Sequence, residues 1–132
     1  MNILKGKIEA ITVNGSLSLV HVKVKDTRLS AIVIDTPETA SYLKIGHSID
    51  VIFKETEVII GMGVEHQISL QNKLEGTVQS IESGSLLSKL ILDTQAGQVT
   101  SIITTNAVKQ LGLQTGSQIT AMIKTNEMML SE

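Results

Sequence analysis

The residues that most often carry chemistry form no local catalytic or metal-binding pattern in this chain. His21, His47 and His66 are scattered, without the spacing to carboxylates or cysteines that metal sites show. No local motif suggests a Ser-His-Asp triad. Gly61-x-Gly63 lacks the third glycine and the following helix of a dinucleotide-binding loop. We therefore expect no metal site and no catalytic residue, and predict that the protein is not an enzyme.

A long internal repeat singles out one lysine. The stretch Leu4-Lys5-Gly6-Lys7-Ile8 returns as Leu74-Glu75-Gly76-Thr77-Val78, a shift of 70 positions (from 4 to 74). The same shift relates Lys54 to Lys124. A lysine near a strand end is ordinarily a solvated surface group, but its retention in both copies favours a role in binding.

The repeat also sets the domain organisation, which we predict as two units at residues 1–62 and 63–132. A unit of roughly 60 residues buries only about 60% of its unfolded surface and is marginal alone. We therefore expect the two copies to pack on each other or to oligomerise. With 42% hydrophobic and only 2% aromatic residues, the core must be built from Ile, Leu, Val and Met.

Each copy is predicted to contain five strands, with one short helix between the third and the fourth. The first copy's strands are expected over Ile3–Thr12, Leu17–Lys25, Leu29–Ile34, Ser48–Phe53 and Glu57–Ile60, and its helix over Pro37–Leu43. The second copy's strands are expected over Leu74–Glu82, Leu87–Asp93, Val99–Thr104, Gln118–Ile123 and Glu127–Leu130, and its helix over Asn106–Leu111. This order predicts an all-β fold of two tandem OB-like Greek-key barrels.

Composition excludes several function classes. The net charge is −2 with no basic block, and Tyr42 and Phe53 are the only aromatic residues. OB barrels that bind single strands stack bases on aromatic side chains in a basic groove, so a nucleic-acid partner is not expected. No run of about 18 apolar residues indicates a membrane span, and no signal-peptide pattern is present. The absence of cysteine fits a cytoplasmic location.

Two segments of the second copy carry a resemblance to a known family. They are Ile68-Ser69-Leu70-Gln71-Asn72-Lys73-Leu74-Glu75-Gly76-Thr77-Val78, and Val108–Leu113 followed by Gly116, Ala121–Thr125 and Met128–Leu130. Together they resemble the Mop, or TOBE, domain of the molbindins, whose motifs are Ser-Ala-Arg-Asn-Gln-Leu-x-Gly-x-Val and Ala-x-Ile-Lys-Ala-Ser-x-Val-x-Leu. The resemblance covers nearly all of the second copy and extends to the first through the repeat. The whole chain is thus similar to a molbindin with two Mop units.

The resemblance implies a set of donors for a tetrahedral oxyanion. Molybdate and tungstate carry acceptor oxygens only, so their sites need hydrogen-bond donors and positive charge. The implied donors are the Ser69 hydroxyl, the backbone N–H groups of Leu70 and Gln71, and the Lys124 ammonium with the adjacent Thr125. Gln71 stands where the family has arginine, so we expect binding to be weakened or its selectivity changed.

Two further positions are assigned through the same resemblance. Thr104 corresponds to a threonine that approaches the oxyanion from a neighbouring subunit, although at a strand end before a helix it could simply be a cap. Lys54 and Glu55 are the first-copy equivalents of Lys124 and Thr125. Because Glu55 is itself an anion, and Ser69 has no counterpart, we expect the first copy to hold a less complete site.

The function implied is intracellular storage or homeostasis of molybdate or tungstate, with no organic cofactor. The family arrangement implies sites between Mop units and a homotrimer that mimics a hexamer of single units. The alternative is a non-catalytic TOBE-type assembly or regulatory module whose oxyanion binding is weakened or lost. The missing arginine and the missing first-copy serine motif favour that alternative.

Overall fold

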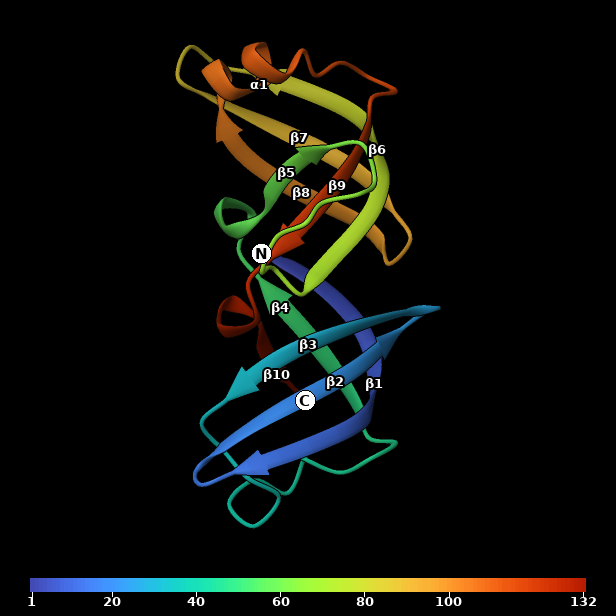
Figure 1. Cartoon of the computed structure of the whole chain (residues 1–132), viewed down its shortest axis with the longest axis vertical. Helices are drawn as coiled ribbons and strands as arrows, with labels where there is room; N and C mark the ends of the chain where they lie inside the picture. The colour runs from blue at the N-terminus through green and yellow to red at the C-terminus, as the bar shows by residue number, and fades with distance from the viewer.

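The two copies form two five-stranded antiparallel sheets, each curled into a small barrel and stacked end to end, as Figure 1 shows for the computed structural model of residues 1–132. Barrel one contains β1 (Asn2–Asn14), β2 (Leu17–Val24), β3 (Thr27–Val33), β4 (Ser48–Phe53) and β10 (Met129–Ser131). Barrel two contains β5 (Ile59–Met62), β6 (Asn72–Ser83), β7 (Leu87–Thr94), β8 (Gly97–Thr104) and β9 (Gln118–Ile123). The predicted all-β fold of two tandem OB-like units is confirmed.

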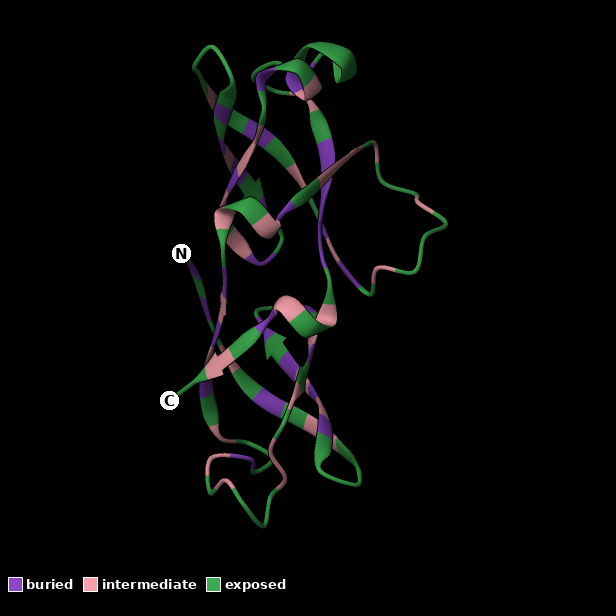
Figure 2. Ribbon diagram, turned by 90° about the vertical axis from the view of Figure 1, so that its left-hand side faces the viewer, coloured by how far each residue is buried: buried purple, intermediate pink, exposed green.

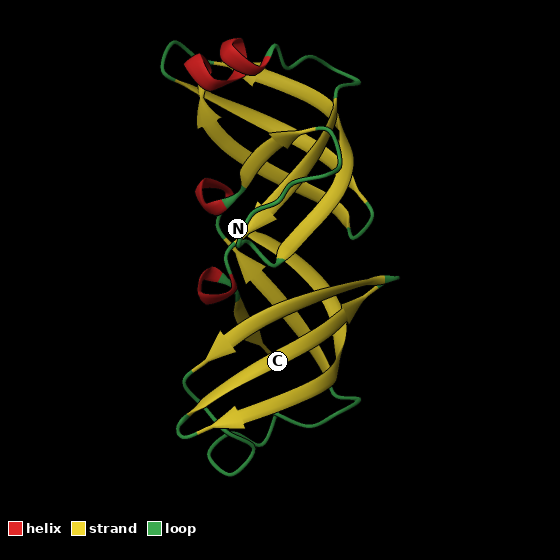
Figure 3. Ribbon diagram, in the orientation of Figure 1, coloured by secondary structure: helices red, strands yellow, loops and turns green.

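The last strand of each sequence copy belongs to the sheet of the other copy. β5 pairs with β9, where Ile60 lies opposite Ala121, and β10 pairs with β4, where Leu130 lies opposite Val51. The chain crosses over through two 3-10 turns, η1 (Glu55–Glu57) and η2 (Thr125–Glu127), which lie at the waist of the molecule (Figure 3). Each sheet contains strands from both copies of the repeat. The division into units 1–62 and 63–132 therefore describes the sequence repeat and stays a prediction as a division into domains.

The helix predicted at Pro37–Leu43 does not form. Only the second copy has an α-helix, α1 (Thr105–Leu111), whose N-cap Thr104 accepts a hydrogen bond from the Ala107 amide and whose C-cap Gly112 is left-handed, with φ of 63°. The repeat places Ile34, Pro37 and Tyr42 at these three positions.

The first copy thus lacks the cap acceptor, the amide donor and the glycine that define the helix in the second copy. What forms instead is a single turn, in which the Thr39 and Ala40 amides donate to the Thr36 carbonyl at 3.0 and 2.9 Å. The prediction of one helix in each copy is therefore wrong for the first copy.

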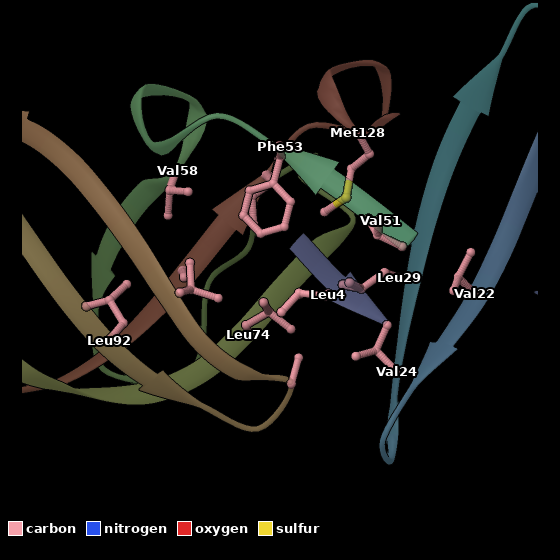
Figure 4. Close-up of a cluster of buried hydrophobic side chains, with 14 of the residues drawn as sticks. Leu4, Val22, Val24, Leu29, Val51, Phe53, Val58, Leu74, Leu92 and Met128 are labelled. Atoms are coloured by element: carbon pink, nitrogen blue, oxygen red, sulfur yellow. The ribbon is translucent and has the colours of Figure 1, made fainter. Parts of the chain in front are cut away.

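One continuous apolar core runs through both barrels. Buried and exposed residues alternate along the strands, so that one face of each sheet is turned inward (Figure 2). Figure 4 shows Leu4, Leu74 and the fully buried Phe53 gathered where the barrels meet. The expectation that two small units complete each other's core is confirmed.

Gly6 and Gly76 lie where the first strand of each barrel passes very close to the second. A Cβ atom on Gly6 would lie 2.5 Å from the Lys23 carbonyl oxygen, and one on Gly76 would overlap the Asp93 carbonyl oxygen. The strand pairing shifts register just beyond each glycine, between Ile8 and Ala10 and between Val78 and Ser80. The absence of a Cβ at each glycine permits the close approach, and a bulge follows it in the same strand.

Candidate functional site

The sheet register brings the two implied donor segments of the second copy together. Asn72, the first residue of β6, pairs with Ile123, the last residue of β9. Because the strands are antiparallel, Gln71 just before one strand and Lys124 just after the other flank the same end of the ladder. This end lies at the waist, where β6 begins (Figure 1).

The donors at this end are accessible and largely uncommitted. Ser69, Gln71 and Lys124 are exposed, and Leu70 and Thr125 are half-buried. The Gln71 side-chain amide reaches only the Ser69 carbonyl, at 3.4 Å. Lys124 takes part in none of the ion pairs of the structure. The cluster thus offers a hydroxyl, an amide and an unpaired ammonium within one short stretch of surface.

The loop before β6 is fastened to barrel two. The Lys73 ammonium donates to the His66 carbonyl at 2.7 Å, and the Thr120 hydroxyl donates to the Gly63 carbonyl at 2.6 Å. Residues 63–71 are therefore not a free linker. These two hydrogen bonds hold the loop that carries Ser69 against barrel two.

The equivalent end of the first copy has a different charge pattern. There Asn2 pairs with Phe53, and the Met1 ammonium donates to the Glu55 carboxylate at 2.9 Å. This hydrogen bond is the main cause that lowers the pKa of Glu55. Lys54 is exposed and takes part in no ion pair, but the adjacent residue is a carboxylate where the second copy has Thr125. The first copy is therefore less suited to an anion.

Thr104 is not brought to Lys124 within one chain. Its hydroxyl accepts the Ala107 amide at 3.0 Å as the N-cap of α1. The strand it ends, β8, packs against η1, whereas η2, which follows Lys124, packs against β3. Thr104 instead lines a groove of about 430 Å³ together with Thr56.

That groove is apolar, and barrel one exposes aliphatic side chains at several of the equivalent positions. Its lining also includes Val58, Ile59, Ile60, Leu87, Ile102, Ile103, Ala107 and Leu111. Leu87 is 56% exposed, and its first-copy equivalent Leu17 is 45% exposed. Ile32, Ile59 and Met129 are also exposed at repeat-related positions. The molecule thus shows two related apolar patches, one on each barrel.

The 70-residue shift of the repeat aligns Asn2 with Asn72, two residues to which the sequence analysis gave no role. Both side chains are buried, at 6% and 1% exposure, and both hydrogen-bond the main chain of the opposite barrel. The signal that could have found them is their recurrence at the repeat spacing, at the start of a strand where a buried polar residue needs a partner.

Two further repeat-related residues, Glu57 and Glu127, also meet across the waist. The Glu57 carboxylate accepts the Lys54 amide at 2.9 Å. Burial first, and then hydrogen bonding to and repulsion from Glu57, raise the pKa of Glu127, while Lys124 acts in the opposite direction. Glu127 therefore gives up its proton at a higher pH than an ordinary glutamate does.

The structure contains neither a metal-ligand cluster nor a helix that could span a membrane. No group of three or more His, Cys, Asp or Glu side chains is placed to hold a metal ion. Among the helices of the structure, none combines the length and the apolarity that crossing a membrane requires.

Comparison with known proteins gives a consistent set of relatives. The TOBE domain model matches residues 68–130. Molybdenum-pterin-binding protein 1 of Clostridium pasteurianum is 34% identical over 64 residues, which cover 48% of this chain and 94% of that protein. A probable molybdenum-pterin-binding protein of Haemophilus influenzae is 38% identical over 65 residues, with the same coverage.

The structural similarity extends over both copies. The cytoplasmic molybdate-binding protein ModG, crystallised with molybdate bound, superposes with a TM-score of 0.89 at 28% identity. The match covers 98% of this chain and 94% of that one. The stacked pair of barrels is therefore an arrangement that the two chains share.

Proposed function

The chain belongs to the molbindin family of Mop, or TOBE, domain proteins, and on this premise we propose that it binds molybdate or tungstate at the Ser69–Gln71 and Lys124–Thr125 end of barrel two. The observation that carries the proposal is the pairing of Asn72 with Ile123, which sets these two segments side by side. The relatives are named for binding molybdenum-pterin or molybdate. We propose that this protein likewise binds the oxyanion and does not catalyse a reaction.

The chemistry of this end suits a tetrahedral dianion. The backbone N–H groups of Leu70 and Gln71 and the Ser69 hydroxyl can donate to the oxyanion, and the Lys124 ammonium supplies charge-assisted hydrogen bonding. The family arginine is replaced by Gln71, which keeps an amide donor but no charge. We expect measurable but weaker binding than a site with arginine would give.

We further propose that the protein assembles as a homotrimer in the cytoplasm, where it stores or buffers the oxyanion. The two apolar patches support self-association, because each exposes several large aliphatic side chains at related positions. Thr104 borders one patch and ends a strand that packs against η1, whereas Lys124 precedes η2, which packs against β3. In an assembly it would be available to a site at a neighbouring chain.

Calorimetric titration with molybdate, tungstate and sulfate tests the binding proposal. Lys124→Ala should raise the Kd for molybdate about tenfold or more, because a charge-assisted hydrogen bond contributes about 1.5–3 kcal/mol. Lys44→Ala, which removes an exposed lysine in the first copy's turn region, is the matched control and should bind like the parent. Absence of heat with both metal oxyanions would refute the function, and equal affinity of Lys124→Ala and parent would show that the site lies elsewhere.

A further inference from the structure

The Asn72 side chain reaches out of barrel two and pairs with a strand of barrel one. Its Oδ1 accepts the Ser30 amide at 2.7 Å, and its Nδ2 donates to the Ser30 carbonyl at 2.9 Å. The side-chain amide thus takes both main-chain groups of one residue of β3, as a neighbouring strand would. With only 1% of Asn72 exposed, water cannot replace these bonds.

The first copy contains the repeat-equivalent arrangement, which serves as an internal control. We call each such pair of side-chain to main-chain hydrogen bonds an asparagine clamp. Asn2 accepts the Thr100 amide and donates to the Thr100 carbonyl, both at 2.8 Å, and Thr100 is the repeat equivalent of Ser30. The two clamps are alike in geometry. They differ in the neighbouring residues, because Asn72 follows the Ser69–Gln71 donors, whereas the Met1 ammonium beside Asn2 is already paired with the Glu55 carboxylate.

The strand to which Asn72 is hydrogen-bonded, β3, also contacts the turn that follows Lys124 of the candidate site. β3 packs against η2, which begins directly after Lys124, as well as against β6. The backbone of Gln71 is therefore one peptide bond from a clamp on β3, and Lys124 is one peptide bond from a turn that rests on β3. A strand of barrel one fixes both donor segments of a site built from second-copy residues.

We propose that Asn72 is a positioning residue for oxyanion binding. By holding Ser30, it fixes the Leu70 and Gln71 amides at the spacing from Lys124 that a tetrahedral dianion needs, so affinity depends on the junction between the barrels. The inference rests on the proposed function of this end. Asn72 itself has both side-chain groups committed to Ser30 and contributes no donor to the ligand.

The test compares Asn72→Leu with Asn2→Leu, because both replace a buried amide by an apolar side chain of similar size at equivalent clamps. Both should lower thermal stability to a similar extent. Only Asn72→Leu should weaken molybdate binding, by about tenfold in titrations well below the unfolding temperature, when two amide donors lose their alignment. Only Asn72→Leu should speed hydrogen exchange at the Leu70 and Gln71 amides.

The unmodified protein provides a second measurement in case Asn72→Leu does not fold. Saturating molybdate should slow exchange of the Ser30 amide more than that of the Thr100 amide, because binding and the Asn72 clamp support each other. Equal slowing of both amides, or equal loss of affinity in the two variants, would overturn the positioning role.

Failure of the proposed function itself would look different. If the parent binds neither molybdate nor tungstate, the function is refuted and the positioning role falls with it. If the parent binds and only the positioning role is wrong, Asn72→Leu and Asn2→Leu will bind molybdate equally well and show equal exchange at the Leu70 and Gln71 amides.

Discussion

Gly76 has no room for any side chain. Its missing Cβ would overlap the backbone of Asp93 in the neighbouring strand, where no rotamer change can relieve the contact. Gly76→Ala should therefore destabilise the protein by about 3 kcal/mol, at the upper end of overpacking costs, in urea unfolding.

The control separates steric overlap from backbone strain. Gly46→Ala places a Cβ in open space but at φ of 87°, so it should cost only about 1–2 kcal/mol. Equal losses for the two variants would show that the close approach of β6 to β7 is unimportant.

Glu127 should make stability depend on pH in an unusual direction for a carboxyl group. Burial and the neighbouring Glu57 raise its pKa from 4.5, so the folded state holds a proton that the unfolded state releases. This contribution is fully present below the ordinary pKa and is lost as the pH rises through the raised value. Glu127→Gln, which resembles the protonated form, should therefore be more stable than the parent at about pH 7 and equal to it at about pH 4.

Thermal unfolding across this range measures the effect, with the exposed Glu65→Gln as control. A stability difference between Glu127→Gln and parent that stays constant with pH would contradict the assignment.

At the scale of elements, Met128 belongs to the second sequence copy but supports the first barrel. It is 2% exposed, and Figure 4 shows its side chain beside Phe53 and Val51. Met128→Ala should cost about 2–5 kcal/mol and should speed hydrogen exchange mainly in β2 and β3. Val58→Ala, the reciprocal change, should act mainly on β7 and β8. If Met128→Ala sped hydrogen exchange mainly in barrel two instead, the assignment of β10 to the sheet of barrel one would be wrong.

The strand exchange could not be predicted from the sequence, although the strands themselves could. The apolar pattern of Ile59–Met62 and Met129–Ser131 fits the edge of either sheet, since the partner strands β4 and β9 occupy repeat-related positions. Which sheet each strand joins depends on the path of η1 and η2, and three-residue turns carry little pattern.

The missing helix has a clearer cause. Asp35 and Pro37 resemble a helix start when viewed alone, but alignment with the second copy puts Pro37 where an amide must donate to the cap. The repeat therefore held the information that local signals concealed.

The candidate site, like the fold, was predictable in part from the sequence. The Ser69–Gln71 and Lys124–Thr125 segments came from the family resemblance, and antiparallel register then set them side by side. The asparagine clamps were not predicted, because a buried asparagine is explained only by a partner from the opposite barrel.

At the scale of the whole molecule, the chain has one shared core but leaves two apolar patches uncovered. Leu87 lies in the groove beside η1 and is 56% exposed, and Leu17 occupies the related position on barrel one. Association that covers both patches would bury several aliphatic side chains, each gaining about 25 cal/mol per Å² removed from water. We expect the parent to scatter light as three chains of 14.2 kDa each.

A charge in either patch should oppose this association, since a buried carboxylate without a partner is costly. Leu87→Asp should shift the measured mass toward a single chain while leaving the barrels folded, because the side chain is exposed in the isolated molecule. Val64→Asp, an equally drastic change in the loop before β6, should leave the mass unchanged. A parent that scatters as one chain would refute the assembly, and an unchanged mass for Leu87→Asp would move the contact surface away from this groove.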